Sequence, residues 1–131
     1  MEPGLLLFSL LTQAAPVTAL LGYVDKQLGP QHRLYPLRAP EGTPLPYVVY
    51  QVVSGTADAT MTCDLADEAR VQLSLFAASY AQVCELHAAC RAALHGQRVG
   101  TVTIDFDGFQ ETHDDRALCY LRTQDYLLEG L

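Results

Sequence analysis

The chain has 131 residues, of which 50% are hydrophobic and 18% charged, and its 15 acidic and 8 basic residues give a formal net charge of −7. This length is typical of one domain with one core, and the composition excludes a disordered chain. The sequence has a single lysine and no basic run, which argues against nucleic-acid binding because that requires phosphates to be neutralised. We therefore predict one domain over residues 1–131.

Two helical segments are predicted at the N-terminus. Leucines follow Pro3 at helical spacing as far as residue 14, and a second piece runs over residues 17–21 and ends at Gly22. The leucine run resembles the core of a signal peptide, but Glu2 precedes it in place of a basic residue, and the run is too short and interrupted to span a bilayer. We expect a core-facing first helix and no membrane partner.

The clearest strand lies at residues 47–53, where Y-V-V-Y-Q-V-V is rich in β-branched and aromatic types. The preceding residues 23–45 are rich in proline and are expected to be irregular, with a short edge strand at 34–37. Apolar residues of both parities in 47–53 predict burial on both faces. We interpret this segment as the central strand, covered on its second face by a helix or a neighbouring subunit.

The second half of the chain shows clean alternation in two places, residues 70–77 and 101–107, and a last strand is predicted at 117–128. Between the first two lies a helix that begins with a capping box of Ser79 and Gln82 and is closed by a glycine at position 96. Acidic loops are expected at 56–68 and between the last two strands.

The predicted order is therefore a helix, a short optional strand, two strands, a helix and two strands. This order indicates an α+β fold with a mainly antiparallel sheet of four to five strands and two helices packed on it.

The sequence shows no catalytic motif. It has neither a G-x-S-x-G segment nor a phosphate-binding glycine loop. His87 and His95 are eight residues apart on the predicted helix, too far to share a metal ion. The run at 113–115, His-Asp-Asp, is more simply a solvated loop tip than a cation site. The four cysteines form no C-x-x-C pair and are expected to be reduced thiols. We predict no enzyme activity, no cofactor and no metal.

The ordered set of segments resembles the tail-completion family of long-tailed phages, which is also found in prophages and gene-transfer particles. The similar segments are A-L-L-G at 19–22, L-P-Y-V-V-Y at 45–50, V-V-S-G at 52–55, V-Q-L-S-L-F-A at 71–77, A-A-C-R-A-A-L-H-G at 88–96 and R-T-Q-D-Y at 122–126. One departure is that the expected R-I/V-Y-P stretch comes late, as R-L-Y-P at 33–36.

The resemblance implies a ring, typically a hexamer, at the head-proximal end of the tail tube, in the neck of a virion assembled in the host cytoplasm. Such a ring ends tube polymerisation and joins tail to head. The implied partners are further copies of the chain, the major tail-tube protein and the head-completion (stopper) protein, while DNA passes through the lumen without specific binding. Two alternatives remain open: another neck component, such as a head-closure or stopper protein, and a small acidic bacterial enzyme or binding protein.

Two groups of residues are candidates for these contacts. The strand surfaces supply the candidates for the subunit or tube interface, namely Tyr47, Val49, Tyr50, Val52, Arg70, Gln72 and Arg122. Acidic residues of the expected loops are candidates for the lumen, where negative charge would repel DNA. They are Asp58, Asp64, Asp67, Glu68, Glu111, Asp114 and Asp115.

Overall fold

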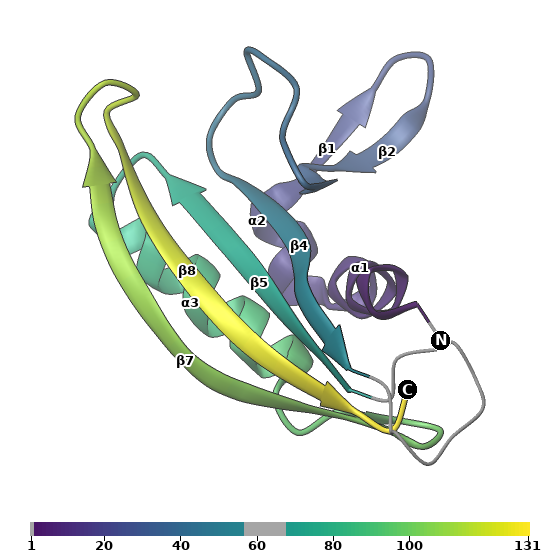
Figure 1. Ribbon diagram of the computed structural model, residues 1–131. Coiled ribbons are helices and arrows are strands. Elements are labelled where there is room, and N and C mark those ends of the chain that lie inside the picture. Colours follow the sequence, from purple (N-terminus) through teal and green to yellow (C-terminus); the bar gives the residue numbers. More distant parts are fainter. Residues whose placement is uncertain (1, 57–67) are drawn as a thin grey trace.

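The computed structural model describes residues 2–56 and 68–131 (Figure 1). The elements in chain order are α1 (Pro3–Gln13), α2 (Ala15–Leu21), β1 (Gly22–Asp25), β2 (Gly29–His32), β3 (Leu34–Pro36), β4 (Tyr47–Thr56), β5 (Glu68–Ala77), α3 (Tyr80–Leu94), β6 (Arg98–Val99), β7 (Val102–Asp114) and β8 (Cys119–Glu129). Six strands form one sheet in the order β3-β4-β5-β8-β7-β6, and β1 and β2 form a separate hairpin. Every pairing in the large sheet is antiparallel except that of β3 with β4.

The predicted α+β class with a mainly antiparallel sheet is confirmed, but the number of strands is wrong, since the sheet has six in place of four or five. Helices α1 and α3 pack on the sheet, and the short helical piece predicted at 17–21 is α2. The β1–β2 hairpin lies in the stretch expected to be irregular. The sequence does not indicate these strands because each has only four residues, they hold glycine and proline, and they show no alternation.

Strand β7 also runs seven residues past its expected end at Asp107. A bulge between Phe106 and Phe109 shifts its register, and Gly108 lies there with φ +111°. The shift breaks the alternation in the sequence, so the second half of the strand has the pattern of a loop.

The helices cover one face of the sheet, and the described residues place no helix on the other (Figure 1). Helix α3 packs against β5, β7 and β8, while α1 lies against β4 and β5. The core between these layers contains fully buried leucines from each of them, such as Leu7 of α1, Leu73 of β5 and Leu86 of α3. The sheet is therefore two-sided, with a core face and an uncovered face.

The capping box of α3 is confirmed in a modified form. The Gln82 backbone N–H donates to Ser79 Oγ at 3.2 Å, while Gln82 Oε1 accepts from the N–H of Ala78, at 3.1 Å, in place of the N–H of Ser79. Gly96 follows the last turn with φ +77°, a backbone conformation that glycine adopts without strain.

The prediction that β4 is the central strand is wrong, whereas cover of its second face by a neighbouring subunit stays a prediction. The strand lies next to the three-residue edge strand β3. Val48 and Tyr50 are buried on the core face, whereas Val49 on the other face is only half-buried and Val52 is 40% exposed. The apolar pattern of both parities thus marks a face and an edge that the described residues leave uncovered.

No single helix among the described residues is long and apolar enough to cross a membrane. Helices α1 and α2 together have the required length and composition, but they meet at a bend of 89°.

Gly22 joins α2 to β1 at a point of close approach. A Cβ placed on Gly22 would lie 2.5 Å from the carbonyl oxygen of Thr18. We expect Gly22→Ala to lower the free energy of unfolding by about 1–3 kcal/mol, because the backbone must shift to admit the methyl group. Chemical denaturation measures this difference. Gly4→Ala is the matched control, since its Cβ would meet the Tyr50 ring at an ordinary 3.5 Å. Equal losses in both variants would contradict the explanation.

Candidate functional site

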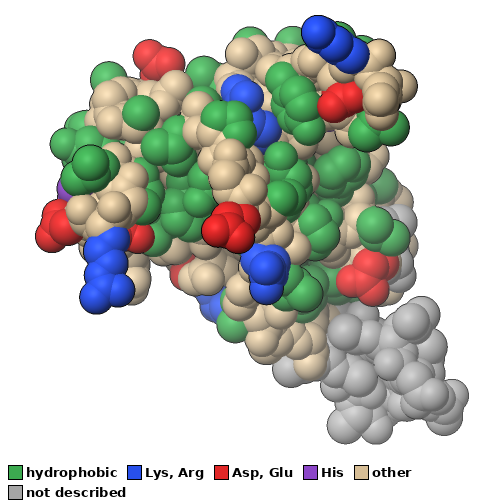
Figure 2. All heavy atoms as spheres, turned by 90° about the horizontal axis from the view of Figure 1, so that it is seen from above, with side chains coloured by type: hydrophobic (Ala, Val, Ile, Leu, Met, Phe, Trp, Pro, Cys, Tyr) green, Lys and Arg blue, Asp and Glu red, His purple; other side chains and the backbone are tan. Residues whose placement is uncertain are grey.

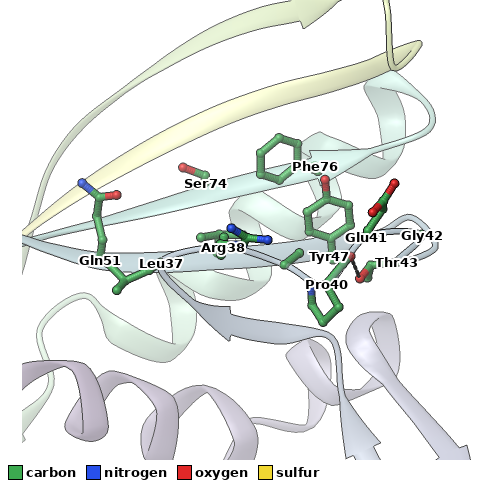
Figure 3. Close-up of a pocket in the computed structure, with 12 residues that line it drawn as sticks. Leu37, Arg38, Pro40, Glu41, Gly42, Thr43, Tyr47, Gln51, Ser74 and Phe76 are labelled. Atoms are coloured by element: carbon green, nitrogen blue, oxygen red, sulfur yellow. Dashed lines mark hydrogen bonds between the residues drawn. The ribbon is translucent and has the colours of Figure 1, made fainter.

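The uncovered face of the sheet is apolar at the end near the start of β4. The rings of Tyr47 and Phe76 stack there with centroids 4.6 Å apart, and Leu121 of β8 lies in register beside Phe76. The loop at 37–43 overhangs this surface and encloses a groove of about 440 Å³ (Figure 3). Val49, Gln51 and Ser74 contribute to the floor of the groove, and Arg38 and Glu41 of the loop supply its charged groups.

The other end of the same face is polar and mainly acidic. Arg70 of β5 forms an ion pair of 2.6 Å with Asp107 of β7, and Gln72 Nε2 donates to Asp125 Oδ1 at 3.4 Å. Both members of the ion pair are partly exposed, so the pair contributes little to stability. Seen from above, hydrophobic side chains cover much of the end with the loops, and acidic and basic groups are scattered among them (Figure 2).

The structure places four of the seven predicted interface residues together on the uncovered face: Tyr47, Val49, Arg70 and Gln72. The other three lie elsewhere. Tyr50 is buried on the core face with its ring 6.3 Å from that of Phe8 in α1. Val52 is on the core side of β4 but 40% exposed, and Arg122 is on the core face of β8.

Arg122 is the centre of a polar cluster beside α3. Its side chain is buried, with a residue exposure of 7%, and its guanidinium donates to Glu111 Oε2 at 2.7 Å and to the Tyr80 hydroxyl at 3.2 Å. The ring of Phe109 lies 4.7 Å from the guanidinium carbon. The Arg122 hydrogen bond holds the pKa of Glu111 below its usual value. Two residues that were expected at different surfaces, Arg122 and Glu111, are therefore partners.

His87 of α3 adjoins this cluster. Its ring packs edge-on against Phe109 and Phe106, with centroids at 4.7 and 5.7 Å. Burial and, secondarily, the charge of Arg122 lower the pKa of His87. Among the described residues, neither His87 Nδ1 nor Arg122 Nε has a hydrogen-bond partner. His87 is therefore a buried helix residue that packs against aromatic rings.

The four acidic candidates that the structure describes do not all lie at one place. Asp58, Asp64 and Asp67 fall outside the described residues, and Glu68 begins β5. Asp114 accepts the N–H groups of Arg116 and Ala117 at 2.9 and 3.1 Å, which lowers its pKa and fixes the β7–β8 turn. Asp115 pairs with His113 at 2.7 Å at the tip of this turn.

The described residues provide no metal site and no disulfide. They contain no group of three or more His, Cys, Asp or Glu side chains that could hold a metal ion. Cys84, Cys90 and Cys119 are free thiols, and burial raises the pKa of Cys90 to about 12. A protonated, buried thiol is a packing residue and not a nucleophile.

Comparison with known proteins identifies the family. The family model described as tail completion protein gp17 matches residues 6–127. Among solved structures, a chain described as "Virion of native gene transfer agent (GTA) particle" has a TM-score of 0.62 and 21% identity, with 95% of this chain and 90% of that chain covered. That likeness shows the fold. No curated protein matches. Because the family match spans nearly the whole chain, the resemblance noted in the sequence is confirmed: the protein belongs to the tail completion protein gp17 family and is a structural component of the virion, in its tail or neck.

Proposed function

We propose that the protein forms a ring, most simply a hexamer, at the head-proximal end of the tail tube, where it ends tube polymerisation and joins the tail to the head. The family match over residues 6–127 carries this proposal. A sheet with one uncovered face and two different edges supports it, because a cyclic ring needs one surface of a subunit to meet a different surface of the next.

The partners follow from this position in the particle. Copies of the chain make the ring, the major tail-tube protein meets one rim, and the head-completion protein meets the other. DNA passes through the lumen without specific binding, since a chain of net charge −7 repels phosphates. A structural role without catalysis is part of this proposal, and it is supported by the packing of His87 against Phe109, the pairing of His113 with Asp115 and the burial of the Cys90 thiol.

Growth of tail tubes in vitro tests this function. Purified tail-tube protein is polymerised with and without the protein, and tube lengths and ends are measured by electron microscopy. We expect shorter tubes with extra density at one end. Protein added after polymerisation should cap tubes without shortening them, which serves as the control. Unchanged tube lengths together with binding to heads or portals would identify a stopper protein and reject termination.

A further inference from the structure

The outer edge of β4 is open over its second half. Strand β3 pairs only with Val48, Val49 and Tyr50. The N–H of Leu37 then donates a hydrogen bond to the Tyr50 carbonyl oxygen at 2.9 Å. Beyond that point β5 still pairs with the inner edge of residues 51–56, but no described strand pairs with their outer edge. An open edge presents unpaired N–H and C=O groups to any strand that can align with it.

The opposite edge of the sheet is open in the same way. Strand β6 pairs only with residues 102–103 of β7. The turn after α3 hydrogen-bonds the next residues: Ile104 exchanges backbone hydrogen bonds with Gly96 and Gln97, and the Phe106 N–H donates to His95 Nδ1. No described strand covers the outer edge of residues 108–114. Each edge is therefore paired with a short strand, β3 or β6, and is then unpaired over about six or seven residues, which is long for an open edge in a monomeric protein.

The two open edges have compatible directions and surfaces. Because β4, β5, β8 and β7 are successively antiparallel, β4 of one copy and β7 of another copy in the same orientation would also pair antiparallel. On the core side, Leu5, Leu37 and Val52 surround a hollow of about 340 Å³ next to the β4 edge. On that same side of β7, Phe109 is 48% exposed. Joining the edges would bury both apolar groups.

The charges disfavour the pairing of two β7 edges. Residues 51–56 of β4 carry no charge, whereas the free part of β7 carries Glu111 and Asp114. Two β7 edges brought together would place acidic groups opposite one another, which is unfavourable. A β7 edge against a β4 edge avoids this repulsion.

The geometry is compatible with a closed ring. In the register of the sheet, the middle of the free β4 segment lies level with residue 105 of β7. The middle of the free β7 segment lies near residue 111. The two middles are therefore offset by about 16 Å along the strand direction, at the rise of a strand. Each copy adds four strand spacings, about 19 Å, so joined strands would tilt by about 40° from the ring axis. Closed barrels have tilts of about 35–45°.

We propose that residues 51–56 of β4 in one subunit pair with residues 108–114 of β7 in the next, so that the ring contains a continuous antiparallel sheet. This inference rests on the proposed ring and names the contact that builds it. The occupant of each open edge is a second copy of this chain.

Proline variants of the two edges test the pairing. The N–H of Val48 points outward to β3, so the N–H of Val52, four residues on along the same strand, points outward as well. Val52→Pro removes this donor and leaves the β4–β5 ladder intact, as proline on an edge strand does. His113→Pro removes the corresponding donor of β7, since Ile104 and Phe106 fix the outward parity before the bulge. Val52→Thr and His113→Ala are the controls that keep the N–H groups.

We expect each proline variant alone to sediment as a 14.3 kDa monomer at concentrations where the wild type and the controls assemble. An equimolar mixture of the two should form a dimer and nothing larger. Val52→Pro keeps a functional β7 edge and His113→Pro keeps a functional β4 edge, so these two edges pair and only disabled edges are left over. Dimers of His113→Pro alone would show β4–β4 pairing and overturn the proposal. Far-UV circular dichroism and thermal melting check that the variants are folded.

Hydrogen exchange on the assembled protein separates this inference from the function itself. In rings or on capped tubes, amides in residues 51–56 and 108–114 should exchange at least tenfold more slowly than in the monomer. Rings or capped tubes with unchanged exchange in both segments would reject the edge pairing and leave the function standing. A wild-type protein that neither assembles nor binds tubes would reject both.

Discussion

Gln124→Leu is expected to lower the free energy of unfolding by about 2–3 kcal/mol, because a buried hydroxyl loses its acceptor. Gln124 and Tyr126 are fully buried on the core face of β8. The Tyr126 hydroxyl donates to Gln124 Oε1 at 2.9 Å, and Gln124 Nε2 donates to the carbonyl oxygen of His87 at 3.0 Å. This chain of bonds ties the sheet to α3 through polar groups that have no access to water.

A double-mutant cycle measures the coupling in this chain by chemical denaturation. Tyr126→Phe alone should cost about 1–2 kcal/mol, since it leaves Gln124 Oε1 without a donor. The double variant should cost less than the sum, because it removes both the hydroxyl and its acceptor. Thr123→Val, on the uncovered face, is the control, with an expected change within about 0.5 kcal/mol. Additive losses would contradict the coupling.

The sequence predicted those elements whose local pattern and packing agree. Strand β5 alternates in the sequence and in the structure, with Val71, Leu73 and Leu75 buried in a row. The limits of α3 followed from Ser79 and Gly96, whose roles depend only on neighbouring backbone. Local chemistry decides these features, so one sequence suffices to find them.

The remaining features depend on distant contacts. A glutamine at position 124 has the pattern of a surface residue, and only the approach of His87 and Tyr126 makes it a core residue. The position of β4 beside the edge depends on β3, whose three residues pair with it in parallel. Strand order in a sheet is a tertiary property that alternation does not encode.

The candidate site was predicted in part for the same reason. Alternation correctly assigned Arg70 and Gln72 to the face opposite the core. The expectation that Glu111 lies in a loop is wrong, because the bulge at Gly108 interrupts the alternation of β7 before Glu111 is reached. No sequence pattern indicated that Glu111 and Arg122 are partners, since their pairing requires β7 and β8 to be aligned in this register.

Glu111→Gln is expected to destabilise the protein more than Arg122→Met, by roughly twofold or more in the fall of the melting temperature. Arg122 is buried, so loss of its carboxylate partner leaves a buried cation without a counter-charge. Loss of the guanidinium instead leaves Glu111, which is half exposed and can be hydrated. Methionine fills a similar volume, so Arg122→Met should change the free energy of unfolding by no more than about 1 kcal/mol. Thermal melting compares both variants, and the double variant should resemble Arg122→Met. A larger loss in Arg122→Met would contradict this order.

The same pair predicts a dependence on pH. The hydrogen bond from Arg122 lowers the pKa of Glu111 below its ordinary value of 4.5 in the folded protein. The folded state thus favours the ionised carboxylate, and the resulting stability is complete above pH 4.5 and is lost as the pH falls through the lowered pKa. Wild-type protein should therefore lose stability more steeply than Glu111→Gln between pH 5 and pH 3. Asp25 and Asp114, whose pKa values are also lowered, are present in both proteins and cancel in the comparison. Parallel curves for the two proteins would show that Arg122 does not stabilise the Glu111 carboxylate, and the buried guanidinium would then have to be held by Tyr80 and Phe109 alone.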